Sequence, residues 1–481
     1  MPMLDPSPSP PSSAGDIDAR PPLSAVLPPL ILGTATFNTQ YVADPTRMHY
    51  TDIVSRALDL GVPAFDTSPY YGPSEILLGQ ALHSLITPPP SSTSPDADAV
   101  HVQPPSPRHK RDDYFLITKA GRIAGDEFDY SPAWIRYSVL RSLKRLHTPY
   151  LDLVYTHDVE FVSPAEVLAA VRELRRLRDE GLIRYVGISY PVPVLCGLAE
   201  MIRRETGEPL DAVMSYCHCS LQNDTLAAGY TATSTAAPAP APAPAPAQDS
   251  TAHPLDRFRA AGVNVVLNAS MLGMGLLTTR GVDNGPQAAW HPSPTALRQA
   301  CAAVAAATTA AGERLERVAI RYALDTWSRA GAAAGLGVGV GVGVGARELE
   351  GGRPLGASVM GVSSLAELEE TWAVWQSVLD SLRPSGELVD EADQERCDAA
   401  VKRYENVQDL VHNTLWPVLG SWRKHSWASG GPDFVNTRRP EDLGTTPDDG
   451  LVEAFEKTAQ ETPIVAKKLD VIVKAVEVTT A

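Results

Sequence analysis

Four proton-handling side chains lie at the ends of three successive strand-like segments. Asp66 ends the first segment, and the Gly/Pro/Ser-rich turn that follows it carries Tyr71. Lys119 and His157 end the second and third segments. Because loops at the carboxyl ends of parallel strands build the site in α/β folds, we expect these four side chains to meet at one mouth. Together they suit acid/base chemistry at a carbonyl or an alcohol.

The segments that would position this group alternate between two patterns. Eight short apolar segments bounded by turn residues predict strands, and they end near Gly33, Asp66, Lys119, His157, Ser189, Tyr216, Asn268 and Gly361. Apolar residues at helical spacing separate them, for example at residues 48–60, 134–146, 165–180 and 315–327. Alternating strands and helices predict a parallel sheet in an α/β fold, and eight such units predict a (β/α)8 or TIM barrel.

Long stretches of biased composition in this chain of 481 residues cannot contribute to a packed core. We expect one large barrel at residues 25–430, with a disordered leader at 1–24 and a C-terminal tail at 431–481. Low-complexity insertions interrupt the barrel at residues 87–111, 231–251 and 330–353. They are rich in Pro and Ser, in Ala-Pro repeats and in Gly-Val repeats, so we expect exposed, disordered loops.

Composition and charge narrow the choice of partner. The formal charge of −16 disfavours nucleic acid and anionic membranes, which repel an acidic surface, and favours a small molecule. No apolar segment reaches the roughly 18 residues of a spanning helix, and the N-terminus lacks a secretory signal pattern. The five cysteines predict reduced thiols and a cytoplasmic location. The oligomeric state is left open.

The turn that carries Tyr71 belongs to a longer motif. Residues 66–79 read DTSPYYGPSEILLG, and further characteristic stretches are ITK at 117–119, RSLKRL at 141–146, YLDLVYTH at 150–157 and IRYVGIS at 183–189. These stretches resemble the aldo-keto reductase family, and outside the insertions the resemblance extends over residues 30–379. It implies a (β/α)8 barrel that transfers hydride between a nicotinamide cofactor and a carbonyl or alcohol.

The resemblance and the chemistry assign the four side chains the same roles. Tyr71 is the expected general acid/base; a phenol has an ordinary pKa of about 10, and the Lys119 ammonium beside it would favour the phenolate. Asp66 would pair with Lys119, and His157 would hydrogen-bond the reacting oxygen. Taken singly, each residue is more often a loop aromatic, a surface charge or a satisfied strand-end histidine. Their joint occurrence at successive strand ends favours catalysis.

The cofactor site is predicted by resemblance alone, since no Gly-x-Gly-x-x-Gly run follows an early strand as a Rossmann domain would require. The resemblance implies contacts from Ser189 and Ser215 at the carboxamide, from Ser270, Leu272 and Gly275 at the pyrophosphate, and from Gly361, Ser363 and Glu367 at the adenosine end. In the same region, Ala269 stands where relatives often carry an aromatic ring that stacks on the nicotinamide.

Glu367 bears on the choice between NAD and NADP. Many NADP-dependent relatives carry arginine at this position. A carboxylate repels a 2′-phosphate but accepts a hydrogen bond from a free ribose 2′-hydroxyl, so we predict NAD as the preferred cofactor and NADP as the alternative. The structural alternative is an acid in the first turn of a helix, where the helix dipole favours negative charge.

The pocket walls point to a sugar substrate. Residues 30–41, 121–123 with 128–131, 157–160 and 215–218 look most like the family's sugar 1-dehydrogenases. That resemblance implies oxidation of the anomeric C1 hydroxyl of an aldose, such as D-arabinose, to the lactone, with Tyr71 as base. The alternatives are an NADPH-dependent aldehyde or ketone reductase and a nucleotide-binding scaffold without catalysis.

The loops around Phe37, Arg122 and His218 would line the substrate pocket, although they carry no readable code for the sugar. Cys217, His218 and Cys219 lack a second ligand pair at zinc-like spacing. We therefore predict no metal site and assign these three residues to the pocket wall.

Overall fold

Eight parallel strands close into a barrel in the computed structural model. They are β1 (Leu30–Gly33), β2 (Ala64–Asp66), β3 (Phe115–Ala120), β4 (Leu151–His157), β5 (Ile183–Ser189), β6 (Ala212–Tyr216), β7 (Val265–Ala269) and β8 (Ala357–Gly361). Each strand pairs with the next in the chain, and β8 pairs with β1. The predicted (β/α)8 barrel and its eight predicted strands are confirmed. The structure describes residues 20–87, 108–189, 192–228, 252–339, 354–383, 390–426 and 433–461.

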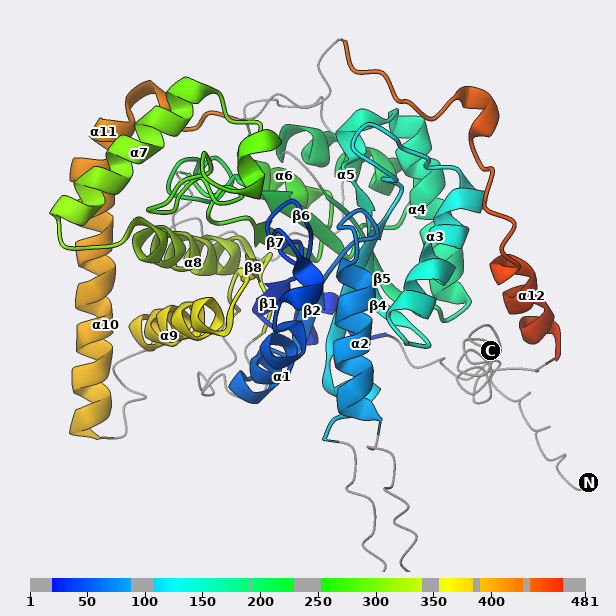
Figure 1. The fold of residues 1–481 in the computed structure, drawn as a ribbon, viewed down its shortest axis with the longest axis horizontal. Coiled ribbons are helices and arrows are strands. Elements are labelled where there is room, and N and C mark those ends of the chain that lie inside the picture. Colours follow the sequence, from blue (N-terminus) through cyan, green and yellow to red (C-terminus); the bar gives the residue numbers. More distant parts are fainter. Residues whose placement is uncertain are drawn as a thin grey trace, which may run out of the picture.

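Helices cover the outside of the barrel (Figure 1). They are α1 (Tyr50–Leu60), α2 (Ser74–Ile86), α3 (Pro132–Arg145), α4 (Pro164–Asp179), α5 (Val192–Thr206), α6 (Pro254–Ala260), α7 (Thr295–Ala310), α8 (Leu315–Ala334) and α9 (Leu365–Leu382). Local sequence sets their starts: Ser131 accepts a hydrogen bond from the Trp134 amide at α3, and Ser163 forms a capping box with Glu166 at α4. None of the helices in the described part of the chain combines the length and apolar character of a membrane-spanning segment.

Three further α-helices follow the barrel in the part of the chain that the structure describes. The long helix α10 (Glu391–Leu410) packs against α8 and α9, and the short α11 (Trp416–Leu419) lies against α7. On the other side of the barrel, α12 (Leu451–Glu461) lies beside α3 (Figure 1). The chain that follows the last strand therefore reaches both flanks of the barrel.

Alternation of side chains along the strands creates two cores. Ile31 and Leu153 point into the barrel and join an inner cluster, whereas Leu32 and Val154 point outward against the helices. Such alternation leaves the strands buried on both faces, which explains why they read as continuous apolar runs. The barrel interior is a packed core, so only its mouth can hold a ligand.

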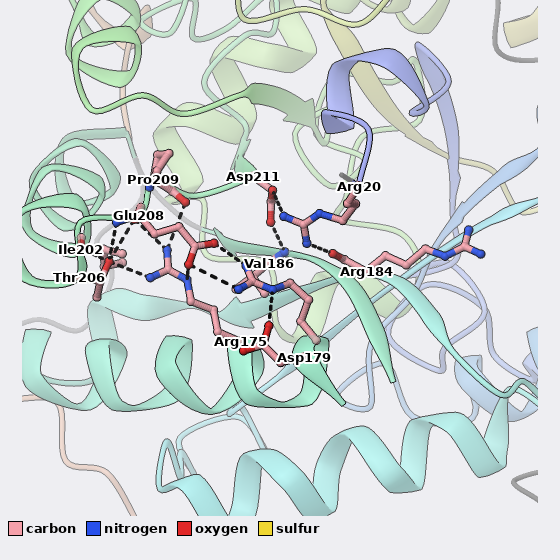
Figure 2. Close-up of polar contacts among 11 residues, drawn as sticks. Arg20, Arg175, Asp179, Arg184, Val186, Ile202, Thr206, Glu208, Pro209 and Asp211 are labelled. Carbon is pink, nitrogen blue, oxygen red and sulfur yellow. Dashed lines mark hydrogen bonds and ion pairs between the residues drawn. The ribbon is translucent and has the colours of Figure 1, made fainter. Parts of the chain in front are cut away.

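The segment before β1 covers the amino-terminal ends of the strands. Leu23 and Leu27 are fully buried and join the inner cluster. Arg20 donates to the carbonyl of Arg184 and pairs with Asp211 at 3.0 Å, as Figure 2 shows. These apolar and charged contacts close the bottom of the barrel and leave the opposite end as the open one.

This finding corrects the predicted leader at residues 1–24, because residues 20–24 pack against the barrel. The two buried leucines form too short an apolar pattern, within a Pro-rich segment, to predict that the segment packs on the barrel. The first insertion ends before Arg111, which pairs with Asp152 at 2.6 Å. The third begins later than predicted, since residues 330–334 continue the alanine-rich α8.

The rest of those predicted segments is not tested. Residues 1–19, 88–107, 229–251, 340–353 and 462–481 lie outside the described residues. The predicted tail is partly described, and there it packs on the barrel. Asn436 bonds the amide and the carbonyl of Phe128 at 2.9 and 2.8 Å, and the Phe434 ring lies 4.7 Å from that of Phe161.

Candidate active site

A cavity of about 1240 Å³ opens at the carboxyl ends of the strands. Four of its lining residues are the predicted catalytic group, Asp66 from β2, Tyr71 from the β2–α2 loop, Lys119 from β3 and His157 from β4. The structure thus brings together side chains that lie up to 91 positions apart in the sequence, the separation of Asp66 and His157.

A buried hydroxyl network fixes the loop that carries Tyr71. Ser74 Oγ donates to the carbonyl of Thr34 at 2.8 Å and lies 2.9 Å from Thr67 Oγ1. One residue further on, the buried Glu75 carboxylate accepts from Thr118 Oγ1 at 2.8 Å and from Arg145 at 3.3 Å. The Ser-Glu pair of the motif therefore ties the start of α2 to three neighbouring elements.

Two glycines of the same motif have structural reasons. Gly72, next to Tyr71, has φ +58°, a conformation that costs most other residues energy. A Cβ at Gly79 would lie 2.1 Å from the carbonyl oxygen of Arg145, so only glycine lets α2 approach α3 this closely. The motif is thus a folding signal for the loop as well as the segment that carries the predicted catalytic residues Asp66 and Tyr71.

Lys119 is the buried centre of the group. Its Nζ donates to Asp66 Oδ1 at 2.6 Å and to the carbonyl of Thr67 at 2.8 Å. It also lies 4.8 Å from the centre of the Tyr71 ring. Because both partners are buried, removal of either side chain would leave an uncompensated buried charge.

The Tyr71 phenol does not carry the predicted low pKa. Burial raises its pKa well above the ordinary value, and the Asp66 and Asp158 carboxylates raise it further, whereas the Arg122 guanidinium lowers it. The Lys119 ammonium is compensated by Asp66 at contact distance. In the protein alone, Tyr71 is therefore a protonated acid.

His157 is held neutral with one nitrogen facing the cavity. Burial lowers its pKa to about 3. Ser68 Oγ accepts from the Tyr70 amide at 3.2 Å and lies 3.1 Å from His157 Nδ1. The Ser68 hydroxyl can donate its hydrogen to Nδ1, and the proton of the neutral ring is then on Nε2. His157 can thus donate a hydrogen bond to an oxygen atom beside Tyr71.

An ion pair between Arg122 and Asp158 lies at the edge of the same cavity. The Arg122 guanidinium bonds the Asp158 carboxylate and stacks 3.9 Å above the centre of the Tyr70 ring. Asp158 Oδ2 is 3.6 Å from His157 Nε2. The sequence placed Arg122 in a pocket loop but assigned it no ion-pair partner. The position of Asp158 directly after His157 was the only sequence signal for the ion pair.

The rest of the cavity extends over the loops after β7 and β8. Among the predicted cofactor residues, Ser189, Ser270, Leu272, Gly275, Gly361, Ser363 and Glu367 line it. At the far end Glu367 Oε2 accepts from the Ser363 amide at 2.7 Å and from its hydroxyl at 2.9 Å. Arg314 and Glu370, which no motif indicated, form an ion pair in the same wall.

Comparison with known proteins matches this geometry to a family. The model of the aldo/keto reductase family matches residues 29–383. The chain belongs to the aldo-keto reductases. It is 37% identical over 310 residues to a D-arabinose 1-dehydrogenase from Saccharomyces cerevisiae, covering 64% of this chain and 78% of that protein. It is 27% identical over 368 residues to an L-galactose dehydrogenase from Arabidopsis thaliana, covering 76% and 85%. The inferred resemblance to sugar 1-dehydrogenases is confirmed.

Aldo-keto reductases use nicotinamide cofactors, and the residues present fit one. The cavity exceeds the roughly 300–1,000 Å³ of a site for one drug-sized ligand, which leaves room for a dinucleotide and a small substrate together. Its long arm is lined by small residues, among them Ser270, Gly275 and Gly361, that let a ligand approach the backbone. Glu367 and Ser363 would hold the adenosine end, and Ser189 the nicotinamide end.

Ser215 corrects the assignment by resemblance. Its side chain is fully buried outside the cavity lining, with Oγ 3.2 Å from His218 Nδ1. Side chains alternate along a strand, so Met214 and Tyr216 face the cavity of this aldo-keto reductase instead. Ser215 therefore lies on the outer face of β6, away from the cavity.

The predicted pocket loops agree with the structure in part. The loops around Arg122 and Phe37 line the cavity, whereas the Phe37 side chain itself and His218 are buried behind the wall. Ala269 stands where relatives often carry an aromatic ring, and its paired residue on the neighbouring strand is Tyr216. A tyrosine ring is therefore present at this wall, on β6 and not on β7.

Proposed function

We propose that this aldo-keto reductase oxidises the C1 hydroxyl of an aldose to the lactone, with NAD as the hydride acceptor. One observation carries the proposal: Tyr71, Lys119, Asp66 and His157 surround one end of a cavity large enough for cofactor and sugar. The names of the two relatives, which act on D-arabinose and L-galactose, support an aldose as the substrate class.

The side chains divide the work at a single oxygen atom. His157 Nε2–H donates to the C1 oxygen and fixes its distance from Tyr71. As the phenolate, Tyr71 takes the hydroxyl proton while the C1–H bond gives up its hydride and the carbonyl of the lactone forms. When bound, an oxidised nicotinamide would accept that hydride and add a positive charge beside the phenol. Lys119, held by Asp66, stabilises the phenolate from below the ring.

The raised pKa of Tyr71 supports a second function, reduction of an aldehyde or ketone with NADPH. A phenol that stays protonated at neutral pH is ready to donate its proton to the carbonyl oxygen. The same four residues serve both directions, since oxidation reverses the path of the proton. The ratio of the two rates then depends on substrate and cofactor.

NAD is the proposed cofactor because a carboxylate, Glu367, lies at the adenosine end of the cavity. Its hydrogen bonds from Ser363 hold that carboxylate in one orientation, and Arg314 in the same wall is already paired with Glu370. A 2′-phosphate would meet a fixed negative charge there, whereas a 2′-hydroxyl can donate to it.

A substrate panel tests the proposal. D-arabinose, L-galactose, D-glucose and a set of simple aldehydes are assayed with NAD, NADP and their reduced forms, and the product of each oxidised sugar is identified as lactone or acid by mass spectrometry. We expect NAD-dependent oxidation of an aldose to be the fastest reaction. Faster NADPH-dependent reduction of simple aldehydes, without aldose oxidation, would contradict the proposal in favour of the reductase.

A further inference from the structure

We infer that Arg122 and Asp158 bind the hydroxyl on C2 of the aldose, next to the reacting C1. The inference rests on the proposed function, because it takes an aldose held by His157 as its starting point. It assigns a substrate-specificity role to two residues that the catalytic chemistry itself does not use.

The pair is built into the wall beside the reacting oxygen. Arg122 lies two residues beyond the end of β3 and Asp158 one residue beyond the end of β4, and each of these strands supplies a catalytic group. Both side chains line the cavity, and both are largely buried, with 17% and 6% of their surfaces exposed. A charge pair that is so poorly solvated and lines a cavity is placed to meet a polar ligand.

Distance selects the atom that the pair would contact. Asp158 Oδ2 lies 3.6 Å from His157 Nε2, the nitrogen that donates to the C1 oxygen. Oxygens on neighbouring sugar carbons are separated by about one hydrogen-bond length. An oxygen on an atom bonded to C1 therefore falls within reach of Asp158 while the C1 oxygen stays on His157.

Hydrogen-bond chemistry then decides between the two oxygens adjacent to C1. The ring oxygen has no hydrogen and cannot donate to a carboxylate, whereas the C2 hydroxyl can. Arg122 is bound by the carbonyls of Ala124 and Gly125 in addition to Asp158, yet each of its two Nη atoms carries a second N–H. Asp158 would accept from the C2 hydroxyl and Arg122 would donate to the same oxygen.

The surroundings hold the pair in place before a sugar arrives. The guanidinium rests on the Tyr70 ring, and the loop that carries Arg122 is bonded through Phe128 to Asn436 of the C-terminal segment. Asp158 is the first residue after β4, and its φ of +61° is the left-handed conformation. This backbone conformation sets the direction of its side chain. A preformed site of this kind loses little entropy on binding.

Two sugars that differ only at C2 test the inference. D-arabinose and 2-deoxy-D-ribose share every other stereocentre, and the second lacks the C2 oxygen. We expect the wild-type protein, at saturating NAD, to show a kcat/KM for D-arabinose about 10- to 100-fold above that for the deoxy sugar, the size expected when buried charged groups lose a hydrogen-bond partner. A ratio near one in the wild-type protein would overturn the inference.

Variants of the pair then locate the discrimination. Asp158→Gly removes the carboxylate and suits the left-handed backbone, and Arg122→Met removes the donors. We expect the ratio to fall toward one in both. Asp283→Gly is the matched control, since Asp283 pairs with Arg298 on the surface at 2.9 Å and does not line the cavity. Loss of the Asp158 charge also alters Tyr71, but it does so for both sugars, so the ratio isolates recognition.

The outcomes separate the inference from the function beneath it. Wild-type discrimination that survives unchanged in Asp158→Gly and Arg122→Met, with normal melting temperature and NADH binding, would overturn the role of the pair and leave aldose oxidation standing. No oxidation of any aldose by the wild-type protein would overturn the proposed function and, with it, the inference. Discrimination that is lost in both variants and kept in Asp283→Gly would support both.

Discussion

Lys119 Nζ lies 2.6 Å from Asp66 Oδ1 and 4.8 Å from the centre of the Tyr71 ring. The ammonium therefore contacts a carboxylate and a phenol at once, and the carboxylate is the closer. Burial raises the pKa of Asp66 as well, although its contact with Lys119 acts in the opposite direction. The positive charge in the site is thus balanced before substrate arrives, while burial, followed by the Asp66 and Asp158 carboxylates, raises the pKa of Tyr71 and keeps its phenol protonated in the protein alone.

This balance predicts the titration of Tyr71. In the free protein, the ultraviolet difference spectrum between wild type and Tyr71→Phe should show no phenolate below about pH 10, because burial and two carboxylates raise the Tyr71 pKa. His157, with its pKa lowered to about 3, should add no titration near its ordinary value of 6.5. A phenolate signal at neutral pH would show that Lys119 dominates over Asp66.

The charge pair beside Tyr71 predicts opposite shifts in rate profiles. Asp158 raises the Tyr71 pKa and Arg122 lowers it. Since the phenolate is the base in oxidation, Asp158→Asn should move the rise of kcat/KM with pH to lower pH, and Arg122→Met should move it to higher pH. Profiles for D-arabinose at saturating NAD measure both. Shifts in the same direction would contradict the electrostatic assignment.

The cofactor preference is tested at Glu367. Glu367→Arg should weaken use of NAD and strengthen use of NADP, because it replaces a charge that repels the 2′-phosphate with one that pairs with it. Glu367→Gln, a control of similar shape, should give intermediate NADP values. The kcat/KM for both cofactors is the measurement. If the two kcat/KM values move together, or remain constant, Glu367 only caps the first turn of α9 through its bond to Ser363.

The C-terminal segment should contribute to stability through one amide. Asn436→Ala removes the partners of the buried Phe128 amide and carbonyl, and we expect a loss of about 1–3 kcal/mol in the free energy of unfolding. Val435→Ala, at a side chain that is 73% exposed, should change it by less than about 0.5 kcal/mol. Urea titration of both variants measures this, and equal values would mean that the segment is only loosely attached.

The barrel and the cavity residues at the strand ends could be predicted because both depend on local pattern. Continuous apolar runs gave β2, β3 and β4, and Asp66, Lys119 and His157 lie at the ends of those runs. The predictions that failed concern the direction and surroundings of individual side chains, which a sequence pattern does not specify. Ser215 was expected in the cavity, but its side chain lies on the outer face of β6, and the pattern alone does not decide the face.

Contacts between distant segments were equally hidden from the sequence. These contacts join segments that lie far apart in the sequence. They include the burial of Leu23, the pairing of Arg111 with Asp152 and the bonds of Asn436. Likewise, the pKa of Tyr71 followed from how deeply it is buried and from which carboxylates lie nearest. Neither quantity has a counterpart in the spacing of residues.

Tyr71→Phe gives the most direct test of the account, because it removes one hydroxyl and leaves the ring in its place. We predict a fall of about 100-fold or more in the rate of D-arabinose oxidation with NAD, with the melting temperature and NADH binding, followed by fluorescence, unchanged. A variant that binds NADH normally and still oxidises the sugar at near the wild-type rate would contradict the central claim that Tyr71 carries the proton.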